Sequence, residues 1–372
     1  MSELDDLREM VRDLLDDRAS SEDVRAVLGS AAGYDARLWQ TVADLDLLGL
    51  LVPDEFGGVG AGLAEMSVVL HELGRRAVPL PVISSAVLAP VALLGGANPA
   101  LAAELLPALA TGAHRAAVIV GGPQGQPDPA TWTLTAAPHD GGYILDGAAG
   151  FVLDAPGADH LVVGARTADG VIVVVADAAD ATVTAVPGTD QTRCLATVTF
   201  TDTALPEERV LATGAQAASL IARVQTVAAY AIACDAVGLA ERTMEQTADY
   251  AKVRQQFGRP IGSFQAIKHM CANMAVAVET SRAGLGLALA ELSRESGEGP
   301  VSAVSTAKAY ACDAAVKVCT DAVQAHGGIG FTWEHDAHLW LKRALLDRAL
   351  FGSPSWHRRR VADAVLPART GA

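Results

Sequence analysis

Arg254 and Phe257 lie near the predicted end of a helix, in the segment Tyr250-Ala-Lys-Val-Arg-Gln-Gln-Phe-Gly-Arg-Pro-Ile-Gly-Ser-Phe-Gln-Ala-Ile-Lys268. A guanidinium in such a place can pair with a pyrophosphate, and an aromatic edge can pack against a bound ring system. The same pair is also consistent with a solvated arginine beside a core phenylalanine. Residue types and spacing alone leave both interpretations open.

A second candidate for ligand binding is the glycine-rich segment Gln324-Ala-His-Gly-Gly-Ile-Gly-Phe331. Glycine allows close approach of the backbone to a ligand, and it equally allows a sharp corner between helices. The stretch Gly57-Gly-Val-Gly60 lacks the Gly-Lys-Ser/Thr and the preceding strand of a phosphate-binding loop. We therefore interpret that stretch as a turn after a helix.

Three histidines suggest a metal site. His335 and His338 are separated by three positions on a predicted helix, and His326 lies upstream. No cysteine or further clustered ligand supports the set, and Trp333 and Trp340 favour a packing surface. No metal site is predicted.

The chain is acidic, with 28 Lys and Arg against 43 Asp and Glu and a formal charge of −15. This balance opposes general attraction to nucleic acid or anionic membrane surfaces and favours small molecules and protein surfaces as partners. The strongest basic clusters are Lys342 with Arg343 and the run Arg358-Arg-Arg360. They could meet phosphates or a partner subunit, but we interpret them as solvated helix ends.

The sequence predicts a cytoplasmic protein without a membrane span. The five cysteines form no C-x-x-C pair, which is typical of small buried thiols in a reducing compartment. The first residues are acidic where a secretory signal would be basic. The richest apolar stretch, Ser85–Leu94, is shorter than the roughly 20 apolar residues that span a bilayer.

Three patterns predict an α+β multidomain fold that would position these residues. Helical spacing of apolar residues over 1–112 predicts an N-terminal helical domain, and its return over 213–372 predicts a C-terminal four-helix bundle. Short β-branched runs over 113–212 predict a small barrel or sandwich. The predicted strands are Ala117–Val120, Trp132–Ala136, Tyr143–Leu145, Leu161–Val163, Val171–Val175, Thr182–Val186 and Thr197–Phe200.

The whole chain resembles the acyl-CoA dehydrogenases, flavoproteins that desaturate acyl thioesters. The resemblance rests on the two C-terminal segments above, on Leu51-Val-Pro-Asp-Glu-Phe-Gly-Gly-Val-Gly60 and on Tyr143-Ile-Leu-Asp-Gly147. It implies that FAD is the cofactor and that Arg254, Phe257 and Gln265 reach its adenosine-diphosphate part across a subunit interface. Gln324, Gly327 and Gly328 would approach the adenine end. By the same resemblance, the partners are an acyl-CoA substrate, a homologous subunit in a dimer of dimers and an electron-transferring flavoprotein.

The chain lacks the expected catalytic base. Desaturation needs a carboxylate to remove the α-proton while the β-hydrogen leaves as hydride. One family position corresponds to Leu350-Phe-Gly-Ser-Pro354 and the other lies near Ala228, and neither holds an acid. Asp235 lies roughly 10 Å along the helix axis from Ala228. Asp347 is the remaining weak candidate.

The part of the site that would hold the flavin ring also departs from the family pattern. Val120-Gly-Gly-Pro-Gln-Gly-Gln-Pro-Asp128 and Phe151-Val-Leu153 replace segments that usually carry hydroxyl donors. The segments that would reach FAD across the interface match the family, whereas those that would hold the flavin ring and the base do not. This contrast motivates the hypothesis of a non-catalytic subunit in a heteromeric enzyme, as in actinobacterial sterol and lipid side-chain degradation. Alternatives are a homotetrameric dehydrogenase with an unrecognised base, a related flavoprotein with other chemistry, and a scaffold without cofactor.

Overall fold

The computed structural model describes residues 2–30, 33–294 and 299–366. The chain forms two compact units, and each is described by itself. The sheet unit comprises Arg25–Met66 and Pro79–Ala228, and the bundle unit comprises Met1–Val24, Ser67–Val78 and Ala229–Ala372. Helices, then strands, then long helices follow one another along the chain, which confirms the predicted fold class. The three-domain boundaries stay a prediction.

The sheet unit is built on an eight-stranded sheet with the order β6-β7-β3-β2-β4-β5-β8, in which β1 pairs with β4. Most pairs are antiparallel, while β1 and β2 each run parallel to β4. The strands are β1 Ala116–Ile119, β2 Thr135–His139, β3 Gly142–Leu153, β4 His160–Thr167, β5 Gly170–Asp177, β6 Thr182–Ala185, β7 Leu195–Pro206 and β8 Val210–Thr213.

One buried apolar cluster holds the strands together. Leu145, Val198 and Phe200 come from β3 and β7, and Val163 and Val174 come from β4 and β5. Such alternation of inward apolar residues is what the β-branched runs predicted. Each predicted strand overlaps an observed one, whereas the short strand β8 was not predicted.

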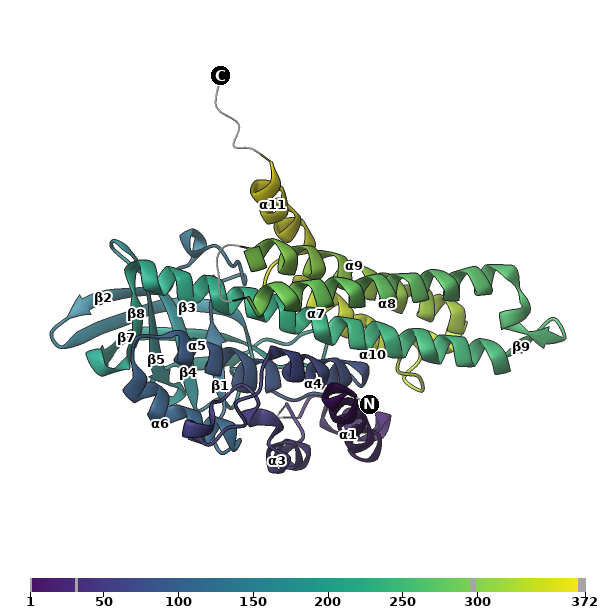
Figure 1. Cartoon of the computed structure of the whole chain (residues 1–372), viewed down its shortest axis with the longest axis horizontal. Helices are drawn as coiled ribbons and strands as arrows, with labels where there is room; N and C mark the ends of the chain where they lie inside the picture. The colour runs from purple at the N-terminus through teal and green to yellow at the C-terminus, as the bar shows by residue number, and fades with distance from the viewer. Residues whose placement is uncertain (1, 31–32, 295–298, 367–372) are drawn as a thin grey trace, which may run out of the picture. The chain divides into compact units, whose positions relative to one another are not determined.

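The helices occupy both ends of the sequence (Figure 1). They are α1 Glu3–Arg18, α2 Ser21–Val27, α3 Ala36–Asp44, α4 Leu63–Arg75, α5 Ala89–Gly95, α6 Pro99–Ala110, α7 Gly214–Val253, α8 Gln265–Leu292, α9 Gly299–His326, α10 Ala337–Ala349 and α11 Pro354–Val365. A π-helical segment, Ile83–Leu88, leads into α5. Gly57–Gly60 forms a turn after a short 3-10 helix, Asp54–Phe56, as predicted.

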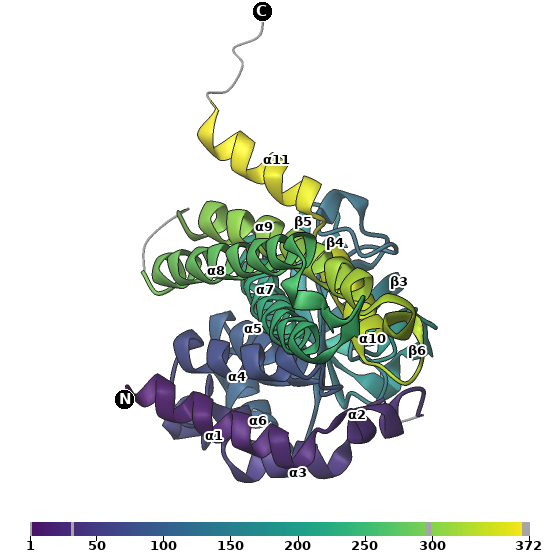
Figure 2. The same cartoon turned by 90° about the vertical axis from the view of Figure 1, so that its right-hand side faces the viewer.

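The bundle unit is organised around the second half of α7. Helices α8 and α9 lie side by side in both views (Figure 1 and Figure 2). Among the described residues, α7 alone is long and apolar enough to cross a membrane, but 78% of its most apolar window is buried inside the protein. Burial of such an apolar window is typical of a helix in a protein core.

Helix α11 extends the predicted bundle by one helix. Ser353 caps its first turn by accepting a hydrogen bond from the Trp356 N–H, and Pro354 begins the helix. His357 lies between α11 and α9, where its Nδ1 is 3.1 Å from Ser305 Oγ. The helix was not predicted because it has few apolar residues at helical spacing, although the serine and proline are a start signal.

Two glycines allow α4 and α7 to cross with their backbones in contact within the bundle unit. A Cβ added to Gly74 would stand 2.2 Å from Asp235 O, and a Cβ added to Gly238 would stand 2.0 Å from His71 O. Both distances are far below a van der Waals contact. The crossing therefore requires glycine on both helices.

Candidate functional site

The first candidate segment forms an exposed hairpin at the end of α7. Arg254 follows the last residue of α7, and its N–H donates to Tyr250 O at 2.9 Å. Strand β9 (Gln255–Gln256) pairs with β10 (Arg259–Pro260), and Phe257 and Gly258 take positive φ values of 53° and 78° at the turn. Two such residues close a tight hairpin. Phe257 is consequently 91% exposed. The hairpin is the projection labelled β9 in Figure 1.

The second candidate segment lies at the same end of the bundle. Helix α9 ends at His326, and Gly327 has a φ of 66° at the start of a 3-10 turn, Gly327–Phe331. The rings of His326 and Tyr250 stack with centroids 4.4 Å apart. This contact joins the end of α9 to the end of α7, so that residues distant in sequence become neighbours.

The exposed groups at this end fit the diphosphate half of a dinucleotide. Arg254, Gln265 and Gln324 are all exposed, and together they supply guanidinium and amide donors. Gly327 and Gly328 have no heavy atom within 4 Å of an added Cβ, so a ligand could approach their backbone closely. The structure brings all the predicted cofactor residues to one end of the bundle unit, and their assignment to FAD belongs to the proposal below.

The position of the expected base is a turn without an acid. Phe351 and Gly352 have φ values of 52° and 103°, and the Phe351 carbonyl is 3.1 Å from His357 Nε2. Burial, with the nearby charge of Lys308, lowers the pKa of His357 to about 3. His357 is therefore neutral at neutral pH and braces the turn. Ala228, the second expected position, is buried on α7.

Asp235 and Asp347 belong to a buried charge cluster in the bundle unit. Arg343 Nε and Nη2 donate to the two carboxylate oxygens of Asp235 at 3.0 and 3.1 Å, and Nε lies 3.8 Å from Asp347 Oδ2. Lys308 Nζ donates to Asp347 O at 2.7 Å. The Asp235 carboxylate is thus held by a bidentate arginine, an arrangement that occupies both of its oxygens.

Arg343 corrects a prediction. It was interpreted as part of a solvated helix end, but its side chain is 1% exposed. The Asp235 carboxylate on α7 compensates the charge of Arg343, which makes its burial possible. Its position along the chain gave no sign of this partner.

The loop expected to hold the flavin ring closes on itself within the sheet unit. The N–H of Gly122 donates to Gln126 O at 2.9 Å, and that of Gly125 donates to Gly122 O at 2.9 Å. Gln225 Nε2 on α7 donates to Val120 O and Pro127 O at 3.0 and 2.6 Å, at the two ends of the loop. These backbone N–H and C=O groups of the loop are therefore already hydrogen-bonded, either within the loop or to Gln225.

The histidines near the end of α9 take part in ring packing. His326 and His335 have ring centroids 4.3 Å apart, and His338 meets Trp333 edge-on at 4.7 Å. Across the described residues, no group of three or more His, Cys, Asp or Glu side chains is arranged to hold a metal ion. The three histidine rings instead pack against one another or against Trp333 and Trp340.

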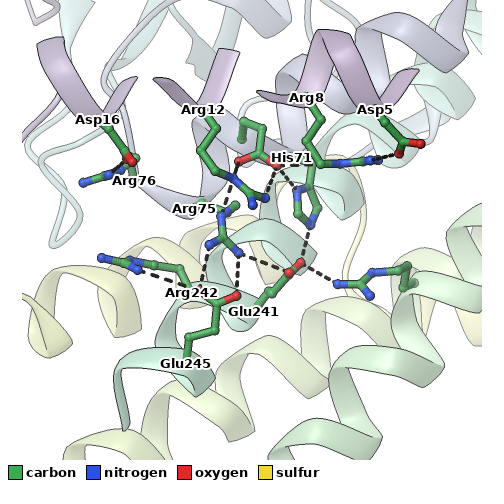
Figure 3. Close-up of polar contacts among 12 residues, drawn as sticks. Asp5, Arg8, Arg12, Asp16, His71, Arg75, Arg76, Glu241, Arg242 and Glu245 are labelled. Carbon is green, nitrogen blue, oxygen red and sulfur yellow. Dashed lines mark hydrogen bonds and ion pairs between the residues drawn. The ribbon is translucent and has the colours of Figure 1, made fainter. Parts of the chain in front are cut away.

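Sequence reasoning missed an ion-pair network that joins α1, α4, α7 and α8 (Figure 3). Arg12 donates to both oxygens of Glu72 at 3.0 and 2.9 Å. His71 Nε2 lies 2.8 Å from Glu241 Oε2, and Arg75 Nη2 lies 2.7 Å from Glu245 Oε2. The available signal was the i, i+3 spacing of Glu72 and Arg75 on α4 and of Arg242 and Glu245 on α7, which indicates charged faces but not their partners.

The His71–Glu241 contact is expected to stabilise the fold most between pH 4.5 and 6.5, the ordinary pKa values of the two groups. Burial opposes both charges, but the charged neighbours outweigh it. Glu241 and Glu72 raise the pKa of His71, and His71 with Arg282 lowers the pKa of Glu241 to about 2. The contribution therefore declines as the pH rises above 6.5 or falls below 4.5. His71→Gln should lower the free energy of unfolding by about 1.5–3 kcal/mol inside this window.

Urea unfolding of the wild type and His71→Gln across this pH range measures the effect. A stability difference that grew above pH 6.5 would contradict the assignment.

Family models and curated relatives match the chain over most of its length. The acyl-CoA dehydrogenase N-terminal domain matches residues 1–113, and the acyl-CoA dehydrogenase C-terminal domain matches residues 207–366. The acyl-CoA dehydrogenase IpdE2 of Mycolicibacterium smegmatis is 35% identical over 357 residues, covering 95% of this chain and 96% of that protein. FadE34 of Mycobacterium tuberculosis is 36% identical over 88% of this chain, which spans 42% of FadE34.

Solved structures extend the likeness to the fold. The ChsE4–ChsE5 complex from Mycobacterium tuberculosis contains a chain with a TM-score of 0.90 and 28% identity, and 99% of each chain is covered. A variant of the Tcur3481–Tcur3483 steroid ACAD gives a TM-score of 0.87 at 28% identity, with 98% of this chain and 97% of that chain covered. With the hairpin, the glycine turn and the bundle described above, these matches show that the chain belongs to the acyl-CoA dehydrogenase family.

Proposed function

We propose that this chain is a subunit of a FAD-dependent acyl-CoA dehydrogenase that desaturates an acyl-CoA thioester between its α and β carbons. We further propose that it is the non-catalytic subunit of a heteromeric enzyme. The observation that carries the proposal is the contrast within one chain. The residues that we assign to the cofactor are exposed together at one end of the bundle unit, while Phe351 and Ala228 stand where a carboxylate base is expected.

Each residue of the exposed set has a defined task in this proposal. Arg254 would pair with the pyrophosphate of FAD, and Gln265 and Gln324 would donate amide hydrogen bonds to its adenosine part. The open backbone at Gly327–Gly328 would allow the adenine end to approach. When bound, FAD accepts the β-hydrogen of the thioester as hydride. The residues of this chain hold and orient the dinucleotide.

The α-proton would be removed by a carboxylate of a homologous partner subunit. Within this chain, the Asp235 carboxylate is bound by Arg343, and Asp347 is fully buried beside the same arginine. A general base must lie within hydrogen-bond reach of the proton that it abstracts. An engaged or buried carboxylate meets this requirement poorly.

The names of similar proteins support a lipid or steroid substrate and a two-chain assembly. ChsE4 and ChsE5 were solved as a complex, and Tcur3481–Tcur3483 is described as a steroid ACAD. By analogy, we propose an acyl-CoA whose acyl part comes from a lipid or sterol side chain, a dimer of dimers, and re-oxidation by an electron-transferring flavoprotein in the cytoplasm.

The flavin content of the purified protein tests the proposal. Expressed alone, the chain is expected to bind clearly less than one FAD per chain. Co-expressed with a homologous subunit that carries the carboxylate base, it should yield a yellow, active complex. Absorbance near the flavin bands gives the ratio, and anaerobic addition of acyl-CoA gives the bleaching. A chain that alone carries one FAD and is bleached by acyl-CoA would establish the homomeric alternative instead.

A further inference from the structure

Four arginines line a polar cavity in the bundle unit, apart from the end that carries Arg254. The cavity has a volume of about 120 Å³ and is lined by Arg12, Leu15, Asp16, Glu72, Arg75, Arg76 and Arg242. We call it the arginine pocket. It lies among α1, α4 and α7, and Figure 3 shows the four arginines around it. Since a single water needs only about 10–15 Å³ of such space, there is room for several waters or for one small anion.

The lining of the arginine pocket has more positive than negative charge. Four guanidiniums and two carboxylates line the pocket, on a chain whose formal net charge is −15. Glu241 and Glu245, outside the lining, each pair with Arg75. Burial, followed by the positive charges of Arg242 and Arg12, lowers the pKa of Arg76. Nearby like charges disfavour one another until a counter-ion reduces their repulsion.

The existing ion pairs leave N–H donors for a ligand. Arg12 uses Nε and Nη2 to bind Glu72, which leaves its Nη1, and Arg76 pairs with Asp16 through Nη2. Arg242 donates from Nε and Nη2 to the amide oxygen of Gln246, and its Nη1 lies 3.7 Å from Glu245 Oε2. A guanidinium carries five N–H donors in a planar fork that matches phosphate oxygens. A tetrahedral oxoanion would therefore find several charge-assisted donors.

A second cavity adjoins the arginine pocket and has an apolar wall. Its volume is about 100 Å³, it shares Arg75, Arg76 and Arg242, and its lining continues to Val24, Leu339 and Trp340. Leu339 and Trp340 are both buried. A ligand with a phosphate and a small apolar body would match the charge of the first cavity and the wall of the second.

We propose that the arginine pocket binds a phosphate monoester, with the phosphate among Arg12, Arg76 and Arg242 and the organic part against Leu339 and Trp340. The site is separate from the residues assigned to FAD, so the proposal does not rest on the proposed function. Free inorganic phosphate shares the phosphate contacts but not the apolar ones. Tighter binding of an aromatic ester than of inorganic phosphate therefore identifies the ligand class.

Calorimetric titration of the full chain, in the assembly in which it is purified, tests the site. Phenyl phosphate and inorganic phosphate are compared with sodium chloride at matched ionic strength. We expect phenyl phosphate to bind more tightly than phosphate, and chloride to produce no saturable signal. Arg76→Gln should weaken phenyl phosphate binding at least about tenfold, because a charge-assisted contact and one unit of charge are lost.

Two further variants separate binding from folding. Asp16→Asn removes a half-exposed acid from the lining and should tighten binding by about threefold, a gain that damage to the fold could not produce. Arg18→Gln on the same helix is the matched control, because Arg18 is exposed, pairs with Asp17 and lies outside the lining. Its affinity should equal that of the wild type.

Several results would overturn the proposal. Equal affinity of the wild type and Arg76→Gln, unchanged or weaker binding in Asp16→Asn, or a chloride signal equal to that of phosphate would each show a nonspecific ion effect. Equal affinity for phenyl phosphate and inorganic phosphate would overturn the assignment of the apolar wall to the ligand.

Discussion

Replacing Asp235 with alanine is expected to lower the free energy of unfolding by about 3–5 kcal/mol, because it leaves a buried arginine without its bidentate partner. Arg343 is 1% exposed, and its two hydrogen bonds to Asp235 are 3.0 and 3.1 Å long. A second carboxylate, that of Asp347, lies 3.8 Å from Arg343 Nε. Denaturant unfolding monitored by circular dichroism measures the loss.

A double-mutant cycle separates the pair from its surroundings. Asp235→Ala combined with Arg343→Met should cost less than the sum of the two single changes, since the second change removes the uncompensated charge. Asp249→Asn is the matched control, because this acid lies on the same helix in an exposed pair with Lys252, and it should change stability little. Additive losses in the cycle would mean that the two side chains do not stabilise each other.

Replacing Arg254 with alanine in the assembled enzyme is expected to lower the affinity for FAD by about 10- to 100-fold, the loss of a charged hydrogen bond to a pyrophosphate. The side chain is exposed at the end of α7, so the fold should be unaffected. Equilibrium titration of the apo-complex with FAD, followed by flavin fluorescence, gives the dissociation constant. Arg254→Lys should lose less, because it keeps the charge but not the planar fork.

Lys252→Ala supplies the control for this measurement. Lys252 lies two residues before Arg254 and pairs with Asp249, so it shares the position at the helix end without the assigned role. Its FAD affinity should match that of the wild type. If both variants lost affinity equally, a general electrostatic effect would explain the result, and the assignment of Arg254 would be wrong.

The sequence predicted most of the fold because local patterns determine most of it. Apolar side chains at helical spacing in α7 and β-branched runs such as that of β5 report which face of an element is buried. Helix α11 was not predicted because its apolar face is small, and its capping residues were the main sign of a helix. Strand β8 was not predicted because a short strand before a long helix has almost no alternation of apolar and polar residues of its own.

The candidate site was predictable only where a motif carries it. The Arg254 and Gln324 segments could be recognised from their resemblance to the family's motifs, and the structure brings them together through Tyr250 and His326. The partners of Asp235 and Glu241 could not be recognised, because each contact joins helices far apart in sequence. Whether a charged residue is buried depends on such a partner, which is why Arg343 was misjudged.

The crossing of α4 and α7 also limits how this part of the protein can evolve. Growth of a side chain at Gly74 or Gly238 meets backbone atoms of the other helix, at Asp235 and His71 respectively. A second substitution changes a side chain but not the backbone atoms that the new Cβ would meet. A smaller residue on the opposite helix therefore cannot relieve the clash at either glycine. The residues whose backbones are touched also carry the ion pairs to Arg343 and Glu241. Separating the helices to admit a methyl group would therefore disturb both charged clusters at once. Selection that preserves either cluster would also preserve the two glycines.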